Sequence, residues 1–224
     1  MAAAISTDPS RERRRGMKAL PDLLPLFPLP NVVLFPQMPL PLHVFEPRYR
    51  KMLGDALDSH KTIGMALLQP GWESDYQGRP AIYPIGCAGL IEQSEPLQQG
   101  RYNILLRGLL RFRVVEEHDG EPYRLASIEP LTDEPGDTSA LEGLRRKVLA
   151  AIGRATDGPV SLVLQSELPD DLFVNALCQS LSLAPIEKQS LLACDGVSAR
   201  CVRLLEILDF LMLEQTYGRG KTIH

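Results

Sequence analysis

The sequence has few residues that bind metals or form disulfides. It contains four cysteines and four histidines. They are Cys87, Cys178, Cys194, Cys201, His43, His60, His118 and His224. No CxxC pair occurs, and the spacing matches no zinc-binding pattern. We therefore expect no metal and no cofactor. Because each cysteine lies in an apolar stretch, we expect reduced core cysteines in a cytoplasmic protein.

Long apolar runs are also missing. No stretch approaches the roughly 18 apolar residues that a membrane-spanning helix needs. Prolines interrupt the apolar segment that follows the N-terminal arginines, which argues against a signal peptide. We therefore expect no membrane segment.

Positive charge is scarce beyond the N-terminus. Residues 1–18 hold five basic and two acidic residues, so the net charge of −4 leaves −7 for the rest of the chain. An acidic protein is an unfavourable nucleic-acid binder. Residues 1–20 predict a disordered basic extension. The alternatives are a tether for an anionic partner, or translation that starts at Met17.

Motifs for common enzymatic chemistries are missing as well. There is no GxSxG sequence for a serine nucleophile. Gly220-Lys221-Thr222 matches the end of a phosphate-binding loop, but position 215 is glutamine and only two residues follow Thr222. Such a loop needs an earlier glycine and a following helix. We therefore expect no catalytic residue and no nucleotide site.

Proline, by contrast, is abundant. Six of the 19 prolines lie between residues 26 and 50, among apolar residues that favour burial. Proline cannot donate to a β-ladder, so it occurs at strand starts, edges and bulges. The segment predicts a rigid barrel corner in which Pro36, Pro39 and Pro41 end one strand and begin the next.

Residues 21–131 predict a strand-rich subdomain. Strands are expected over 31–35, 40–45, 62–69, 81–93, 101–107, 109–116 and 123–130. Helical spacing behind Pro47 predicts one helix. We expect the strands at 101–107 and 109–116 to be neighbours, with Arg111 and Arg113 on a solvated face. Many short strands indicate a closed or half-closed barrel.

The second half of the chain has a helical pattern. Residues 132–139 predict a linker whose acidic side chains, including Asp133, are solvated. Residues 140–217 predict a bundle of four helices, and residues 218–224 a flexible tail. The fold class is therefore α+β.

One loop stands out between the predicted strands. Trp72 and Tyr76 lie in the polar segment QPGWESDYQGRP. Such aromatic side chains either fold down over the core or face a partner, since loops on rigid scaffolds carry recognition. Glu46, next to the predicted helix start, is expected to be a cap or an ion-pair partner.

Residues 25–53, PLFPLPNVVLFPQMPLPLHVFEPRYRKML, closely resemble the opening of the Lon N-terminal domain family. The resemblance continues in GCAGLIEQ (86–93) and GRYNILLRGLLRFRVVEE (100–117), and more weakly over 187–208. It implies a PUA-like β pseudo-barrel followed by a C-terminal α-helical subdomain. It also implies a non-catalytic module, similar to free-standing Lon-domain proteins that lack the ATPase and protease modules.

The resemblance implies binding of unfolded or tagged polypeptides, or of a protease or chaperone partner. We expect the binding surface to combine Phe35, Met38 and Pro39 with Trp72 and Tyr76. Extended peptides would lie on this surface or add to a barrel edge. The alternatives are an RNA-binding PUA-like protein that uses the cluster Arg107, Arg111 and Arg113, and a small-molecule pocket between the two halves.

Overall fold

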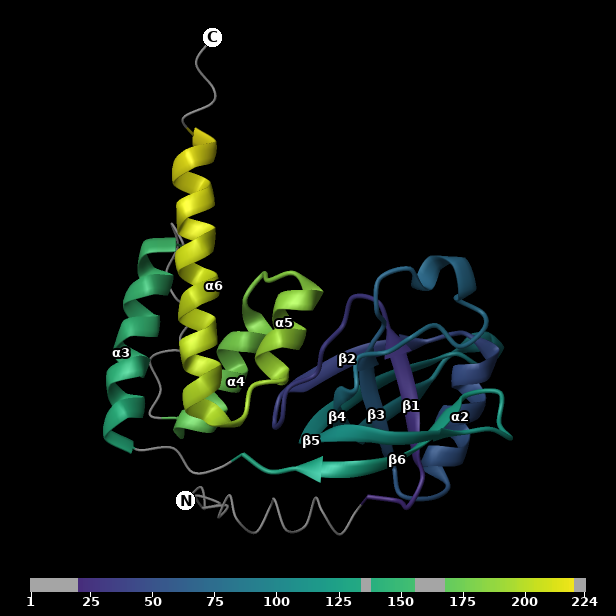
Figure 1. Ribbon diagram of the computed structural model, residues 1–224. Coiled ribbons are helices and arrows are strands. Elements are labelled where there is room, and N and C mark those ends of the chain that lie inside the picture. The colour runs from purple at the N-terminus through teal and green to yellow at the C-terminus, as the bar shows by residue number, and fades with distance from the viewer. Residues whose placement is uncertain (1–19, 134–137, 156–167, 220–224) are drawn as a thin grey trace. The chain divides into compact units, whose positions relative to one another are not determined.

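The computed structural model describes residues 20–133, 138–155 and 168–219 (Figure 1). The chain divides into two compact units, with the boundary between Leu131 and Thr132. The predicted extension at 1–20 lies outside the described residues apart from Leu20, as do 134–137 of the predicted linker and 220–224 of the predicted tail. Among the described helices, none combines the length and apolarity of a membrane span.

The first unit is a six-stranded sheet that closes on itself. Its strands are β1 (Leu24–Leu29), β2 (Pro39–Val44), β3 (Thr62–Leu67), β4 (Ile85–Pro96), β5 (Tyr102–His118) and β6 (Arg124–Leu131). They lie in the order β2-β5-β4-β3-β1-β6, and a further pairing of β5 with β6 closes the barrel. β1 and β3 are parallel, and the other pairs are antiparallel. The expected α+β class and pseudo-barrel are confirmed.

β5 makes the closure possible because it is long enough to have two neighbours on one side. Residues Tyr102–Arg107 pair with β2, and residues Arg111–His118 pair with β6. The prediction of two neighbouring strands, 101–107 and 109–116, is therefore wrong. Gly108 does not break the strand. It leaves room for another chain segment, since a Cβ atom there would lie 2.1 Å from the carbonyl oxygen of Phe35.

The predicted strand at 31–35 is also wrong. The first strand lies earlier, at Leu24–Leu29, and residues 31–35 have no regular structure. Val33, Leu34 and Phe35 are nevertheless buried, each at 5% exposed or less. The apolar run therefore signals burial, but this segment packs as an irregular stretch rather than as a β-strand.

A tight turn connects this segment to β2. The amide of Met38 donates to the carbonyl oxygen of Phe35 at 3.2 Å, and Gln37 has a positive φ of 66°. Gln37 N donates to Gly108 O at 2.8 Å, and Gly108 N donates to Met38 O at 3.0 Å. Pro36 at the second turn position matches the preference of such turns. The expected proline corner is present, fixed to the middle of β5.

The same hydrogen bonds explain how β2 accommodates its prolines. Because Met38 O faces β5, the backbone groups of every second residue after it, starting at Leu40, also face β5. The backbone nitrogens of Pro39 and Pro41 therefore face away, on the open edge of the sheet. The ladder loses no hydrogen bond, as expected for prolines on an edge strand.

The barrel core contains Leu24, Leu26, Ala88, Phe112 and Ala126, all fully buried. Beside it, helix α2 (Pro47–Leu57) packs near β1 and β3 (Figure 1). Two short 3-10 turns, η1 (Trp72–Asp75) and η2 (Gln98–Gly100), lie in the connecting loops.

The arginine pair of β5 differs from the expectation. Arg113 is exposed as predicted, but only 2% of Arg111 is exposed. Alternation along a strand predicts which side of the sheet a residue faces. It does not reveal whether other parts of the chain cover that side.

The second unit contains α3 (Thr138–Ala155), α4 (Asp170–Ser180), α5 (Pro185–Leu192) and α6 (Gly196–Arg219), so the four predicted helices are present. α6 contacts each of the other three. Its Arg200 is completely buried and donates to Asn175 Oδ1 at 2.7 Å and to Leu191 O at 3.1 Å. Arg200 also pairs with Asp133 at 3.4 Å. The prediction that Asp133 is solvated is wrong, because only 13% of its side chain is exposed.

Candidate functional site

The first turn of α2 is joined to the loop that carries Trp72 and Tyr76. Glu46, the residue before the helix, makes no side-chain cap hydrogen bond. Instead its carboxylate pairs with Arg48 at 3.2 Å and accepts a hydrogen bond from the Tyr76 hydroxyl at 2.5 Å. Of the two roles expected for Glu46, the ion-pair role is confirmed; Glu46 does occupy the N-cap position, but its side chain does not cap the helix.

Arg48 lies between two tyrosine rings. Its guanidinium carbon is 4.6 Å from the ring centroid of Tyr49 and 5.0 Å from that of Tyr76. It also donates to the carbonyl oxygen of Tyr76 at 3.1 Å. Trp72 contacts Tyr76 edge to face at 5.4 Å, and Tyr49 contacts Phe27 at 4.4 Å. We call these five side chains the aromatic–arginine stack. Cation–π contacts of this kind are favourable when partly desolvated.

The stack shows how the loop aromatics are arranged. Trp72 and Tyr76 are both half-buried. The pair is therefore folded down onto α2 rather than projecting freely, while part of each side chain stays accessible. Burial, followed by the hydrogen bond to Glu46, raises the pKa of Tyr76. Burial also raises the pKa of Tyr49, to about 12, against the opposing charge of Arg48. Both hydroxyls therefore stay protonated at physiological pH.

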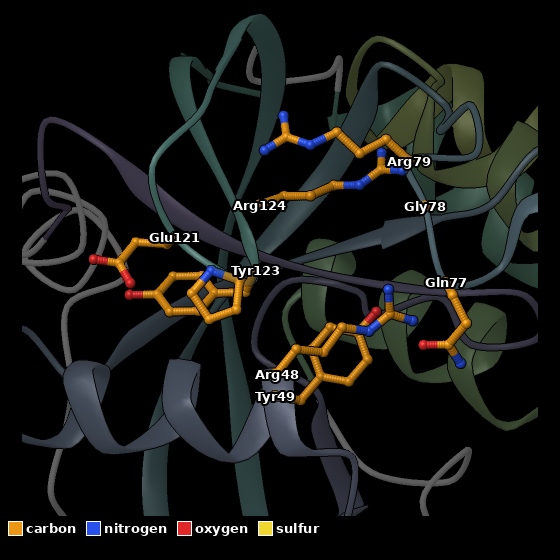
Figure 2. A pocket seen from close by; sticks show the side chains of 9 residues that line it. Arg48, Tyr49, Gln77, Gly78, Arg79, Glu121, Tyr123 and Arg124 are labelled. Atoms are coloured by element: carbon orange, nitrogen blue, oxygen red, sulfur yellow. The ribbon is translucent and has the colours of Figure 1, made fainter.

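A cavity of about 240 Å³ lies next to the stack (Figure 2). It is lined by Arg48, Tyr49, Gln77, Gly78, Arg79, Glu121, Pro122, Tyr123 and Arg124. These residues come from α2, from the loop after η1, and from the turn that leads into β6. Three arginines and three residues with hydroxyl or carboxylate groups give the cavity a polar, basic lining.

The arginines that line the cavity differ in how deeply they are buried and in their ion-pair partners. Arg124 is only 6% exposed, donates to Pro80 O at 2.5 Å and pairs with Glu117 at 3.4 Å. Burial lowers the pKa of Arg124, and the nearby charges of Arg79 and Arg48 act in the same direction. Arg79 is more exposed and pairs with Asp119 at 2.8 Å. Positive charge is thus concentrated around one small space.

Tyr123 is held by the C-terminal half of α2. Its hydroxyl donates to Asp55 Oδ2 at 2.7 Å, and Lys51 pairs with the same carboxylate. Hydrogen bonds from Lys51 and then from Tyr123 lower the pKa of Asp55. The cavity wall is therefore tied to the helix by a small hydrogen-bonded network.

The other predicted binding residues lie elsewhere. Phe35 is completely buried and Met38 is 7% exposed, so both are core residues; Pro39 is exposed. None of the three lines the cavity. The open edge of β2 is also poorly suited to strand addition, because Pro39 and Pro41 offer no N–H groups there.

The arginines proposed for RNA contact do not form a free basic cluster. Arg111 is buried, Arg107 pairs with Glu92 at 2.6 Å, and Arg113 lies 3.7 Å from Glu129. Sequence reasoning missed the arginines that do converge, at 48, 79 and 124. The one available signal was the position of Arg79 in the same polar loop as Trp72.

The family model and the curated relatives that match this chain all point to one protein family. The family model of the ATP-dependent protease La (Lon) substrate-binding domain matches residues 23–209. Lon protease of Dictyoglomus thermophilum is 32% identical over 158 residues, which cover 70% of this chain and 19% of that protein. Lon protease of Flavobacterium johnsoniae is 26% identical over 209 residues, which cover 90% of this chain and 26% of that protein. The chain thus spans about a quarter or less of these relatives' length.

Solved structures agree. A Lon N-terminal domain protein from Xanthomonas campestris is similar with a TM-score of 0.58 and 25% identity, covering 82% of this chain and 97% of that one. The N-terminal domain of Lon protease from the Mycobacterium avium complex has a TM-score of 0.66 at 14% identity, covering 84% and 98%. At that identity the second likeness concerns the fold alone. The barrel, the helical unit and the match over residues 23–209 together establish that the chain belongs to the Lon substrate-binding domain family.

Proposed function

We propose that this protein is a non-catalytic recognition module that binds unfolded or tagged polypeptide segments. The observation that carries the proposal is the match of residues 23–209 to a substrate-binding domain. Because a shared fold does not guarantee a shared role, the proposal also needs a suitable surface. The aromatic–arginine stack and its neighbouring cavity are that surface.

The stack is suited to this role because it is already ordered. Tyr76 is held by Glu46 through its hydroxyl and by Arg48 through its carbonyl oxygen. Its ring, with Trp72 against it, therefore offers apolar area that costs little conformational entropy to bind against. An extended peptide would place apolar side chains on this pair.

The proposal includes the setting in which recognition occurs. We propose that the module passes polypeptides to a protease or chaperone partner and performs no reaction itself. We also propose a cytoplasmic location, which is supported by the four cysteines, three of them buried and none in a disulfide. Fractionation of cells followed by immunodetection tests the location.

Binding can be tested directly because Trp72 is the only tryptophan of the chain. We would titrate the protein with a permanently unfolded, tryptophan-free polypeptide and follow the emission of Trp72. A saturable change is expected, since the indole is half-buried beside Tyr76. A fluorescein label on the polypeptide gives an independent affinity by anisotropy.

The variant pair for this test is Trp72→Ala with Tyr76→Ala, and the matched control is Phe210→Ala. Phe210 is 58% exposed and lies on α6 in the other unit. Loss of two aromatic anchors should weaken binding about tenfold or more, while the control keeps wild-type affinity. Unchanged affinity in the double variant would exclude the stack as the surface. Absence of any binding by the wild-type protein would refute the proposed function.

A further inference from the structure

The charges that line the cavity are strongly asymmetric. Arg48, Arg79 and Arg124 contribute three guanidinium groups, and Glu121 is the only lining carboxylate (Figure 2). The carboxylate of Glu121 lies 3.6 Å from Nζ of Lys51, which is not a lining residue. The negative charge of Glu121 is therefore shared with a cation outside the cavity.

The carboxylates that pair with the three arginines are not lining residues either. Glu46, Asp119 and Glu117 make those pairs, at 3.2, 2.8 and 3.4 Å. They hold the guanidinium groups in place from residues that do not line the cavity. Arg79 is the least restrained, because its own side chain is 41% exposed and that of Asp119 is 92% exposed. Ion pairs this exposed contribute little, so Arg79 can exchange its partner.

A separate observation concerns the hydroxyl of Tyr49. The side chain lines the cavity and the residue is only 4% exposed. The hydroxyl is not among the fully buried, unpartnered side-chain atoms of the described residues, so it remains accessible to a group in the cavity. An acceptor placed in the cavity could receive a hydrogen bond from it. The tyrosine hydroxyl and the arginine N–H groups can all donate hydrogen bonds, and the arginines are positively charged. A ligand that fits the cavity would therefore be a hydrogen-bond acceptor with negative charge.

We propose that this cavity binds a carboxylate of the polypeptide, either an acidic side chain or the C-terminal carboxylate. The planar guanidinium fork of arginine matches a carboxylate in two parallel hydrogen bonds. The inference rests on the proposed polypeptide-binding function and adds a chemical preference to it. A polyphosphate chain fits less well, because residues 19–224 carry a net charge of −7 and repel a long polyanion.

The test uses four versions of one unstructured, fluorescein-labelled peptide of about 15 residues with apolar positions held constant. They combine glutamate or glutamine at the two acidic positions with a free or an amidated C-terminus. The peptide with both kinds of carboxylate should bind at least about tenfold more tightly than the one with neither, the usual effect of a charge-assisted hydrogen bond. The two mixed peptides identify which carboxylate enters the cavity.

The variants are Arg79→Gln and Tyr49→Phe, with Arg113→Gln as the control. Arg113 is exposed and lies outside the cavity, and its replacement changes the net charge by the same amount as that of Arg79. We expect Arg79→Gln and Tyr49→Phe to reduce the carboxylate preference while the control keeps it, and we expect the preference to weaken with salt. Thermal unfolding verifies that each variant is folded.

Three outcomes would overturn the inference. Equal binding of all four peptides leaves the polypeptide-binding proposal intact but removes the carboxylate preference. A preference that persists in both cavity variants places the carboxylate site elsewhere. Displacement of the peptide by a short single-stranded RNA at lower concentration than by the acidic peptide itself would indicate a phosphate site. Failure of every peptide to bind would instead count against the proposed function.

Discussion

Gly108 offers the sharpest test of how the proline-rich segment is fixed to the barrel. A Cβ atom at this position would lie 2.1 Å from the carbonyl oxygen of Phe35 and 2.9 Å from its carbonyl carbon. Both are backbone atoms, so no side-chain rotation relieves the contact. Gly108→Ala must therefore push the Phe35–Met38 turn away from β5 or distort the strand.

The size of the effect follows from what the shift disturbs. Strain from one added methyl group in a packed site costs about 1–3 kcal/mol. The two hydrogen bonds between Gly108 and the turn, at 2.8 and 3.0 Å, would lengthen, each worth about 0.5–1.5 kcal/mol. We expect the free energy of unfolding to fall by about 2–5 kcal/mol, measured by urea denaturation of the first unit.

Gly54→Ala is the matched control. Gly54 lies inside α2, and a Cβ atom there would have no neighbour within 4 Å. Alanine is favoured over glycine in a helix by about 1 kcal/mol, so this variant should be more stable than the wild type. If Gly108→Ala were as stable as the wild type, the close contact between the turn and β5 would be refuted.

Two further predictions concern buried polar groups. Arg200→Met should lower the free energy of unfolding by about 3 kcal/mol, because it removes the buried partner of Asp133 and Asn175. Denaturation followed by far-UV circular dichroism measures this change. A loss below about 0.5 kcal/mol would contradict the prediction. Tyr49 has its pKa raised to about 12 in the folded protein, so its contribution to stability is fully present below about pH 10 and is lost as the pH rises toward 12. The difference in stability between wild type and Tyr49→Phe should therefore change between pH 9 and pH 12, and a constant difference would show that the tyrosine is not buried as described.

Much of the fold follows from local pattern. Apolar runs bounded by turn residues predict most strands, and helical spacing predicts the helices, because these signals depend on neighbouring residues alone. The segment at 31–35 shows the limit. Its apolar residues are buried, but strand formation requires a partner ladder, and partners are chosen by residues far away in the sequence. For the same reason the sequence suggested that Gly108 separates two strands, whereas in the structure it leaves room for the backbone of Phe35 beside one continuous strand.

Some residues of the candidate site could likewise be predicted from the sequence, and others could not. Trp72 and Tyr76 could be singled out from the composition of their loop, although not their contacts with Arg48. Tyr49 and Arg124 could not be linked from sequence, since barrel closure brings together residues about 75 positions apart. Burial of Phe35 and Met38, which sequence reasoning placed on the surface, likewise depends on packing against distant strands.

The outward prolines of β2 have a consequence for self-association. Open sheet edges are templates on which identical chains stack into oligomers and fibrils. With Pro39 and Pro41 at outward positions, incoming chains find carbonyl groups but too few N–H donors to continue the sheet. For a protein proposed to bind unfolded polypeptides, the shortage of outward N–H donors keeps the β2 edge from acting as a template for their aggregation.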